Sequence, residues 1–186
     1  MNLNEIKATI PDYAKDLRLN LDSVLAETGA PGLTKKQISL IALAGAIASR
    51  HVPLIDAIAM EAAKSASPQE LDGARSAAAI MAMNNVYYRF THLVSDPEYQ
   101  TLRAGLRMNA MANPGCDKLD FELCSIAVSA INGCGQCMDS HEKTLKKHGV
   151  SAQAIQGAVR IAAMVHAVAV TLEQTASAIS EFAAAA

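Results

Sequence analysis

Two cysteines and a histidine lie close together in the second half of this 186-residue chain. The segment reads Cys134-Gly-Gln-Cys137-Met-Asp-Ser-His141 and directly follows Asn132-Gly133, which we expect to end a helix. Cysteine attacks as the thiolate, and a free thiol with a pKa of about 8.5 is mostly protonated at neutral pH. Both thiols fall in the first turn of the following helix, where unpaired N–H groups and the helix dipole stabilise an anion. The segment therefore predicts a reactive thiol site.

His141 follows Cys137 by four residues, so both side chains lie on one face of the expected helix. The histidine can accept the Cys137 proton, directly or through water, and then stand as a cation beside the thiolate. The spacing of Cys134 and Cys137 also permits a disulfide within one turn, a bridge that is easily made and broken. Glu122 on the preceding helix could orient His141 or carry a proton, if that helix folds back over the site.

Two other interpretations of the thiol pair remain open. The thiols could be packed core residues, or Cys134, Cys137 and His141 could be three ligands of a zinc ion. Zinc needs a fourth ligand, and the remaining candidates are poorly placed: Cys116, Cys124 and His148. No second Cys-x-x-Cys is present, and a thioredoxin domain is excluded because the chain lacks a βαβ pattern. We therefore expect no metal, and we expect Cys116 and Cys124 to be packed or incidental thiols.

The composition indicates one soluble helical domain over residues 1–186. Alanine supplies much of the apolar content, aromatic residues are only 4% and tryptophan is absent, which favours close helix packing over β-sandwiches or barrels. A net charge of -2 gives no reason to expect nucleic acid or an anionic membrane as a partner. The N-terminus lacks the pattern of a signal peptide, and the longest apolar stretch, 38–49, is too short to span a bilayer. We expect a cytoplasmic protein.

Apolar periodicity and capping residues predict a succession of helices with short breaks. Pro11 should interrupt the first helix, Thr34 and Ser151 should cap later ones, and Ser67-Pro-Gln-Glu70 predicts a capping box. The expected helical ranges are 4–25, 35–50, 53–65, 68–88, 97–106, 120–131, 134–148 and 152–178.

The chain also indicates an internal repeat. Shifting it by 84 residues aligns Ser67-Pro-Gln-Glu-Leu-Asp-Gly-Ala with Ser151-Ala-Gln-Ala-Ile-Gln-Gly-Ala. We expect two helical halves, about 1–95 and 96–186. Because no cysteine occurs in the first half, it would be a scaffold copy, and the second half would carry the site.

The site segment resembles the signature of the alkyl hydroperoxide reductase D (AhpD) family, within the carboxymuconolactone decarboxylase-like superfamily. The matching residues are Phe121-Glu122-Leu123, Ser129-Ala-Ile-Asn-Gly-Cys-Gly-Gln-Cys137 and His141-Glu142. Further similarity at 11–16, 83–89, 105–109 and 113–115 extends the resemblance over nearly the whole chain.

The resemblance implies an all-α homotrimer with peroxidase activity and no bound metal or haem. Family members reduce the oxidised peroxiredoxin AhpC and take electrons from a lipoyl-bearing partner of the 2-oxoacid dehydrogenase E2 type, so the dihydrolipoyl group is a substrate. By position, Cys137 would become the sulfenic acid, and Cys134 would donate a proton and close the Cys134–Cys137 disulfide. Glu122 and His141 would form the proton relay.

One residue departs from the family pattern. Some members have histidine immediately before the second cysteine, where this chain has Gln136. Glutamine can hydrogen-bond but does not titrate, so a proton-carrying role at that position is absent, whereas the route through Glu122 and His141 is unaffected.

Two alternative functions follow from the same residues. A carboxymuconolactone decarboxylase-like lyase would transfer protons through histidine and carboxylate without thiols, and the Cys-x-x-Cys pair argues against it. A non-enzymatic zinc-binding helical module is the second.

The remaining conspicuous residues are predicted to be structural. Tyr87-Tyr88-Arg89 should lie in the core or an interface, and His51, His92 and His166 on the surface or hydrogen-bonded in the core. Helix contacts should take up the methionines Met81, Met83, Met108 and Met111.

Overall fold

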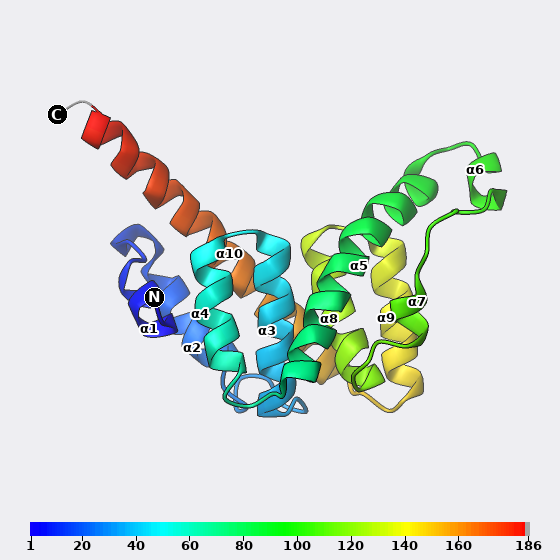
Figure 1. Ribbon diagram of the computed structural model, residues 1–186, viewed down its shortest axis with the longest axis horizontal. Coiled ribbons are helices and arrows are strands. Elements are labelled where there is room, and N and C mark those ends of the chain that lie inside the picture. Colours follow the sequence, from blue (N-terminus) through cyan, green and yellow to red (C-terminus); the bar gives the residue numbers. More distant parts are fainter. Residues whose placement is uncertain (185–186) are drawn as a thin grey trace.

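The computed structural model describes the backbone of residues 1–184 and the side chains of residues 1–175. In this part of the chain every regular element is helical, which confirms the predicted all-α class (Figure 1). The elements are α1 (Leu3–Ala8), a 3-10 turn (Asp12–Ala14), α2 (Lys15–Val24), α3 (Lys35–Ser49), α4 (Val52–Ala62), α5 (Pro68–Leu93), α6 (Glu98–Thr101), α7 (Asn109–Ala112), α8 (Lys118–Ile131), α9 (Gly135–Lys147) and α10 (Ala152–Ala184).

Helix α8 lies at the centre of the fold. It packs against α3, α5, α9 and α10, and all ten of its residues from Asp120 to Ser129 are buried. A helix that is surrounded on all sides must be apolar around most of its circumference, and the α8 sequence meets that requirement. The polar side chains that α8 carries, including Glu122, therefore lie inside the protein and need partners there.

Local capping signals predicted the helix starts well. Pro11 separates α1 from the next helical turn, and Thr34 and Ser67 each form a capping box at the start of α3 and α5. Ser151 Oγ accepts the N–H of Ala154 at 3.1 Å in the first turn of α10. Each cap satisfies backbone donors that have no partner within the helix.

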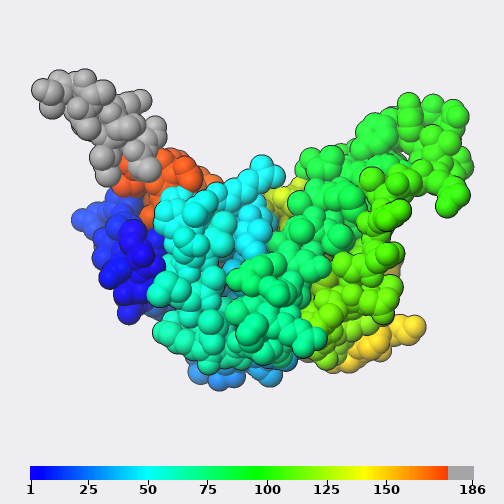
Figure 2. Space-filling model, in the orientation of Figure 1, coloured from blue at the N-terminus to red at the C-terminus, as the bar shows by residue number. Residues whose placement is uncertain are grey.

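Four predicted helix ends were wrong. Helix α4 ends at Ala62, before Ser65. Helix α5 continues past Tyr88 to Leu93, and α10 continues past Ala178 to Ala184. The helix expected over 97–106 is the single turn α6, after which Leu102 is extended and Gly105 has a φ of 63°. The end of α5 and α6 project away from the body of the molecule, so little packing supports a longer helix there (Figures 1 and 2).

The helix order is compatible with the proposed duplication. Helices α3, α4 and α5 start at Lys35, Val52 and Pro68, and α8, α9 and α10 start 83 or 84 residues later, at 118, 135 and 152. The internal repeat and the division near residue 95 stay predictions.

Helix α10 is longer and more apolar than the sequence reasoning recognised. Residues Ala152–Thr175 are long and apolar enough to cross a membrane by length and composition. However, 61% of that apolar window is buried inside the protein, and α10 packs against α2, α3 and α8. Burial against other helices accounts for the apolar composition of α10, as in the core helix of a soluble protein.

A charged cluster joins α3, α5 and α8 at the start of the buried helix. Asp120 is only 3% exposed, and its carboxylate accepts Gln37 Nε2 at 2.9 Å and pairs with Lys36 Nζ at 2.8 Å. Lys36 also pairs with Glu70 at 2.9 Å. The Ser67 backbone N–H and Lys36 lower the pKa of Glu70 to about 2. The stabilisation from Glu70 is therefore complete above its ordinary pKa of 4.5 and is lost as the pH falls toward about 2.

Replacing Lys36 with methionine should destabilise the fold, because it leaves the Asp120 carboxylate buried without its cation. We expect a loss of about 2–3 kcal/mol in the free energy of unfolding, less than the roughly 3–5 kcal/mol of a fully buried pair, since Lys36 is partly exposed. Denaturant unfolding measures the loss, with the exposed Lys35→Met as the matched control in the same turn. Adding Asp120→Leu should restore part of the stability; equal stabilities for Lys36→Met and Lys35→Met would contradict the assignment.

Candidate active site

The turn between α8 and α9 sets the position of both site cysteines. Helix α8 ends at Ile131, and Gly133 adopts a φ of 69°, a left-handed conformation that favours glycine. The chain then turns so that Cys134 caps α9, and its Sγ accepts the backbone N–H of Cys137 at 3.3 Å. This N–H is one of the donors at the helix start that can also stabilise a thiolate on Cys134.

Cys134 and Cys137 form a disulfide in this structure, with their Cα atoms 5.3 Å apart. The two cysteines differ in how accessible they are to solvent. Cys134 is fully buried at 0% exposure, whereas Cys137 is 6% exposed and lines a cavity. A reagent that enters from solvent through this cavity therefore meets Cys137 first.

The structure brings Glu122 and His141 together. Because α8 and α9 are joined by a short turn, α8 folds back along α9, and Glu122 Oε2 lies 2.6 Å from His141 Nδ1. Both side chains are buried. The carboxylate accepts a hydrogen bond from Nδ1–H, so the other ring nitrogen, Nε2, is left to act as base or acid on the cavity side.

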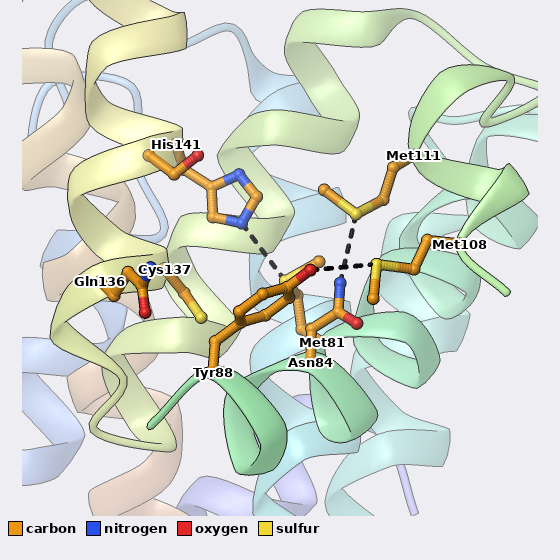
Figure 3. Close-up of a pocket in the computed structure, with 9 residues that line it drawn as sticks. Met81, Asn84, Tyr88, Met108, Met111, Gln136, Cys137 and His141 are labelled. Carbon is orange, nitrogen blue, oxygen red and sulfur yellow. Dashed lines mark hydrogen bonds between the residues drawn. The ribbon is translucent and has the colours of Figure 1, made fainter. Parts of the chain in front are cut away.

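The second ring nitrogen of His141 faces a thioether. Nε2 lies 3.3 Å from Met81 Sδ, and this contact is drawn in Figure 3. A thioether is a weak acceptor only, so this neighbour offers nothing to a neutral Nε2 and can accept a hydrogen bond from a protonated one. The ring of His141 therefore has a carboxylate at one nitrogen and a thioether at the other.

A cavity of about 290 Å³ lies in front of Cys137 and His141 (Figure 3). Its walls come from α5, α7, α9 and the residue before α7: Met81, Asn84, Tyr88, Met108, Met111, Gln136, Cys137, Ser140 and His141. A disulfide, a histidine and several thioethers therefore share one small chamber that is open to solvent at one side.

Sequence reasoning missed the contribution of α5 and of the segment around α7 to this chamber. Tyr88 was assigned to core or interface, and the methionines to helix contacts, but Tyr88, Met108 and Met111 line the cavity. Met81 is buried, as expected of a packing residue, and it also contacts His141. The spacing of residues 81, 84 and 88 places them on one face of a helix. This shared face was the sequence feature that could have indicated their place in the chamber.

Gln136 stands between two cavities. It lines the chamber in front of Cys137 and also a neighbouring cavity of about 330 Å³. Tyr88 is the other residue common to both, and Tyr87, His92 and Tyr99 are among the remaining lining residues of the second cavity. Gln136 is therefore at the exposed edge of the site.

A polar network, buried at Asn85 and Ser129, holds the turn that carries Cys134. Asn85 Nδ2 donates to Ser129 Oγ at 2.9 Å, and Asn85 Oδ1 accepts from Asn132 Nδ2 at 2.9 Å. Arg89 Nη1 donates to the Asn132 carbonyl oxygen at 2.6 Å. Helix α5 thus fixes both the end of α8 and the start of α9.

The other two cysteines lie outside the chamber. Cys124 is buried in α8, and burial raises the pKa of its thiol. Cys116 is half-buried against Gly73, at a site where a side chain on residue 73 would overlap its sulfur, and burial likewise raises its pKa. The burial of Cys124 and the packing of Cys116 against Gly73 agree with the prediction of packed or incidental thiols.

The other candidate residues are placed as follows. His51 Nδ1 lies 2.6 Å from Glu173 Oε1, and Ser49 Oγ lies 3.2 Å from His166 Nδ1. Among the described residues, no group of three or more His, Cys, Asp or Glu side chains is arranged to hold a metal ion.

Comparison with known proteins shows which family the chain belongs to. The model of the carboxymuconolactone decarboxylase family matches residues 97–181. Relatives called alkyl hydroperoxide reductase AhpD match nearly the whole chain. One from Streptomyces avermitilis is 56% identical over 176 residues, 95% of this chain and 98% of its own length. One from Rhodopseudomonas palustris is 55% identical over 97% of this chain and 98% of its own length. One from Coxiella burnetii is 53% identical over 90% of this chain and 94% of its own.

By the family match and its fold, this chain is a helical protein of the carboxymuconolactone decarboxylase type, with a cysteine pair in its second half. Within that class, the chain belongs to the alkyl hydroperoxide reductase AhpD family.

Proposed function

We propose that this chain reduces hydroperoxides with the thiol pair Cys134 and Cys137. The observation that carries the proposal is the placement of Cys137 on a solvent-open cavity beside His141, whose ring is held by the buried Glu122. The names of the relatives support the same reaction class.

The oxidative half-reaction follows from the positions of these groups. His141 takes the Cys137 proton, and the thiolate attacks the terminal oxygen of the hydroperoxide, so that the O–O bond breaks and Cys137 becomes the sulfenic acid. The departing alkoxide takes a proton from the Cys134 thiol. The Cys134 thiolate then attacks the Cys137 sulfur and the disulfide forms. The hydroxide that leaves takes the proton from His141 and becomes water. One hydroperoxide becomes one alcohol and one water, and two thiols lose two electrons.

The reductive half-reaction starts at the same sulfur. Because Cys134 is fully buried, an incoming thiolate attacks Cys137 and Cys134 leaves. The backbone N–H of Cys137, which Cys134 Sγ already accepts, stabilises the leaving thiolate. A second thiol on the donor then releases Cys137, so a dithiol donor completes the step without a second molecule.

The finer assignment is that the donor is a dihydrolipoyl group, carried by a 2-oxoacid dehydrogenase E2-type protein, and that the chain regenerates oxidised AhpC. It would act as a cytoplasmic homotrimer with no resident cofactor. Two facts support this assignment: one dithiol donor molecule can complete the reduction by itself, and the relatives share the name alkyl hydroperoxide reductase AhpD.

A donor comparison tests this assignment. The purified protein is assayed for tert-butyl hydroperoxide reduction with dihydrolipoamide, thioredoxin or glutathione, and for reduction of oxidised AhpC. We expect turnover with dihydrolipoamide at least about tenfold above that with glutathione, since the second thiol of dihydrolipoamide closes its ring intramolecularly. Equal turnover with dihydrolipoamide and with glutathione would contradict the assignment of a dithiol donor.

The decarboxylase name of the matching family favours one alternative, a lyase that uses Glu122 and His141 without thiols. Such an enzyme would keep its activity after both cysteines are replaced with serine, whereas the proposed peroxidase would lose it. Metal analysis of the purified protein addresses a zinc module, for which stoichiometric zinc would be required.

A further inference from the structure

Asn84 presents an unusual polar group to the chamber in front of Cys137. The side chain is 2% exposed, and it lines the same cavity as Cys137 and His141. Its Oδ1 is buried and has no hydrogen-bond partner within the protein. A buried acceptor without a partner costs free energy, so its presence calls for an explanation.

The orientation of the Asn84 amide is fixed by its neighbour. Nδ2 donates to Met111 Sδ at 3.2 Å, as Figure 3 shows. A thioether only accepts hydrogen bonds, so the amide nitrogen must face Met111 and the oxygen is left free. The adjacent Asn85 shows the contrast, because both ends of its amide have partners within the protein.

The other cavity groups make no hydrogen bond to Oδ1. Met81, Met108 and Met111 carry no N–H or O–H on their side chains, and the Tyr88 hydroxyl donates to Met108 Sδ at 3.6 Å. The side chains of Gln136, Ser140 and His141 carry donors, but none of them is bonded to Asn84. A ligand that satisfies Asn84 must therefore bring its own hydrogen-bond donor into a chamber walled largely by thioethers and one aromatic ring.

We infer that Asn84 is a substrate-binding residue that accepts a hydrogen bond from the O–H of the hydroperoxide. The inference rests on the proposed peroxidase function. A hydroperoxide carries one donor, on the terminal oxygen that Cys137 attacks, so this bond holds the reacting atom in place. The hydrogen stays on that oxygen as the O–O bond breaks and the sulfenic acid forms, and Asn84 neither gains nor loses a proton.

The cavity walls indicate which organic group the hydroperoxide can carry. With the O–H held by Asn84, an organic group has the apolar walls of Tyr88, Met108 and Met111 to contact. Flexible thioether side chains adapt to different shapes, which suits a range of small organic hydroperoxides rather than one compound. Hydrogen peroxide presents the same O–H but makes none of the apolar contacts.

The test uses Asn84→Leu, which keeps the side-chain size and removes the acceptor. The reduced protein is mixed with tert-butyl hydroperoxide or hydrogen peroxide, and the rate of Cys134–Cys137 disulfide formation is followed. We expect both rates to fall about tenfold or more, because both peroxides present the same O–H. Alkylation of Cys137 by iodoacetamide and reduction of the disulfide by dihydrolipoamide should change less than about twofold, since neither reagent has a hydrogen-bond donor on the atom that reacts with Cys137.

The matched control is Asn109→Leu, the same change at an exposed position of α7, and it should behave as the unmodified protein. A merely structural role for Asn84 would slow alkylation and disulfide reduction together with peroxide attack, and that result would overturn the inference. So would unchanged peroxide rates, or a loss confined to tert-butyl hydroperoxide. Failure of the unmodified protein to consume either peroxide would instead refute the proposed function itself.

Discussion

Cys137→Ser should abolish hydroperoxide turnover, whereas Cys134→Ser should permit a single oxidation. Serine cannot ionise near neutral pH, so the first variant should lose at least about a thousandfold in kcat/KM. In the second variant Cys137 still attacks, but no thiol closes the disulfide, and the sulfenic acid accumulates. Steady-state assays measure the first loss, and mass spectrometry after trapping with dimedone detects the second product.

The two variants separate the roles of the cysteines because the residues differ in access. Cys137 lines the cavity and Cys134 is fully buried. The control is Cys116→Ser, which changes a half-buried thiol outside the chamber and should retain full turnover. Sulfenic acid on Cys134 in the Cys137→Ser variant would reverse the assignment of the attacking thiol.

The part of the site that comes from α8 and α9 could be predicted because it is local. Cys137 and His141 are four residues apart on one helix, and Glu122 is on the helix just before it. A short Asn-Gly turn between two helices makes them antiparallel neighbours, so the Glu122–His141 contact at 2.6 Å follows from the turn. Their catalytic roles stay predictions until variants are assayed.

The contribution of α5 could not be derived in the same way. Asn84 and Tyr88 lie about 50 residues before the cysteines, so their place in the chamber depends on how α5 packs against α9. The sequence of α5 is rich in alanine and gives little direction to one face. Tertiary packing decides which side of such a helix faces the site, and local propensity contains no information about it.

The helix boundaries likewise could be predicted where local contacts decide them and not where tertiary packing does. Starts were predicted well because Thr34 and Ser67 satisfy backbone donors with their own side chains, a purely local effect. Ends were predicted poorly because packing decides them. Helix α6 stops after one turn where the chain projects from the body, and Leu102 beyond it is exposed.

Replacing Glu122 with glutamine should slow peroxide reduction by about a hundredfold or more while leaving the fold intact, because general acid–base catalysis contributes that much. The carboxylate holds the His141 ring and compensates its positive charge, whereas the neutral amide cannot. Less imidazolium then accompanies the Cys137 thiolate, so fewer thiols ionise at neutral pH. The rate of Cys137 alkylation by iodoacetamide should therefore reach its plateau at a higher pH in Glu122→Gln than in the unmodified protein.

The chain contains its own control for this experiment. His51 and Glu173 form a second imidazole–carboxylate pair at the same distance of 2.6 Å, and neither residue lines the chamber of Cys137. Glu173→Gln removes the same charge from the same kind of pair and should leave both peroxide reduction and the alkylation profile unchanged. Because Glu173 is 63% exposed, its loss should also cost little stability. Equal effects of the two substitutions would mean that Glu122 acts through the overall charge or stability of the protein, and the proton relay would have to be abandoned.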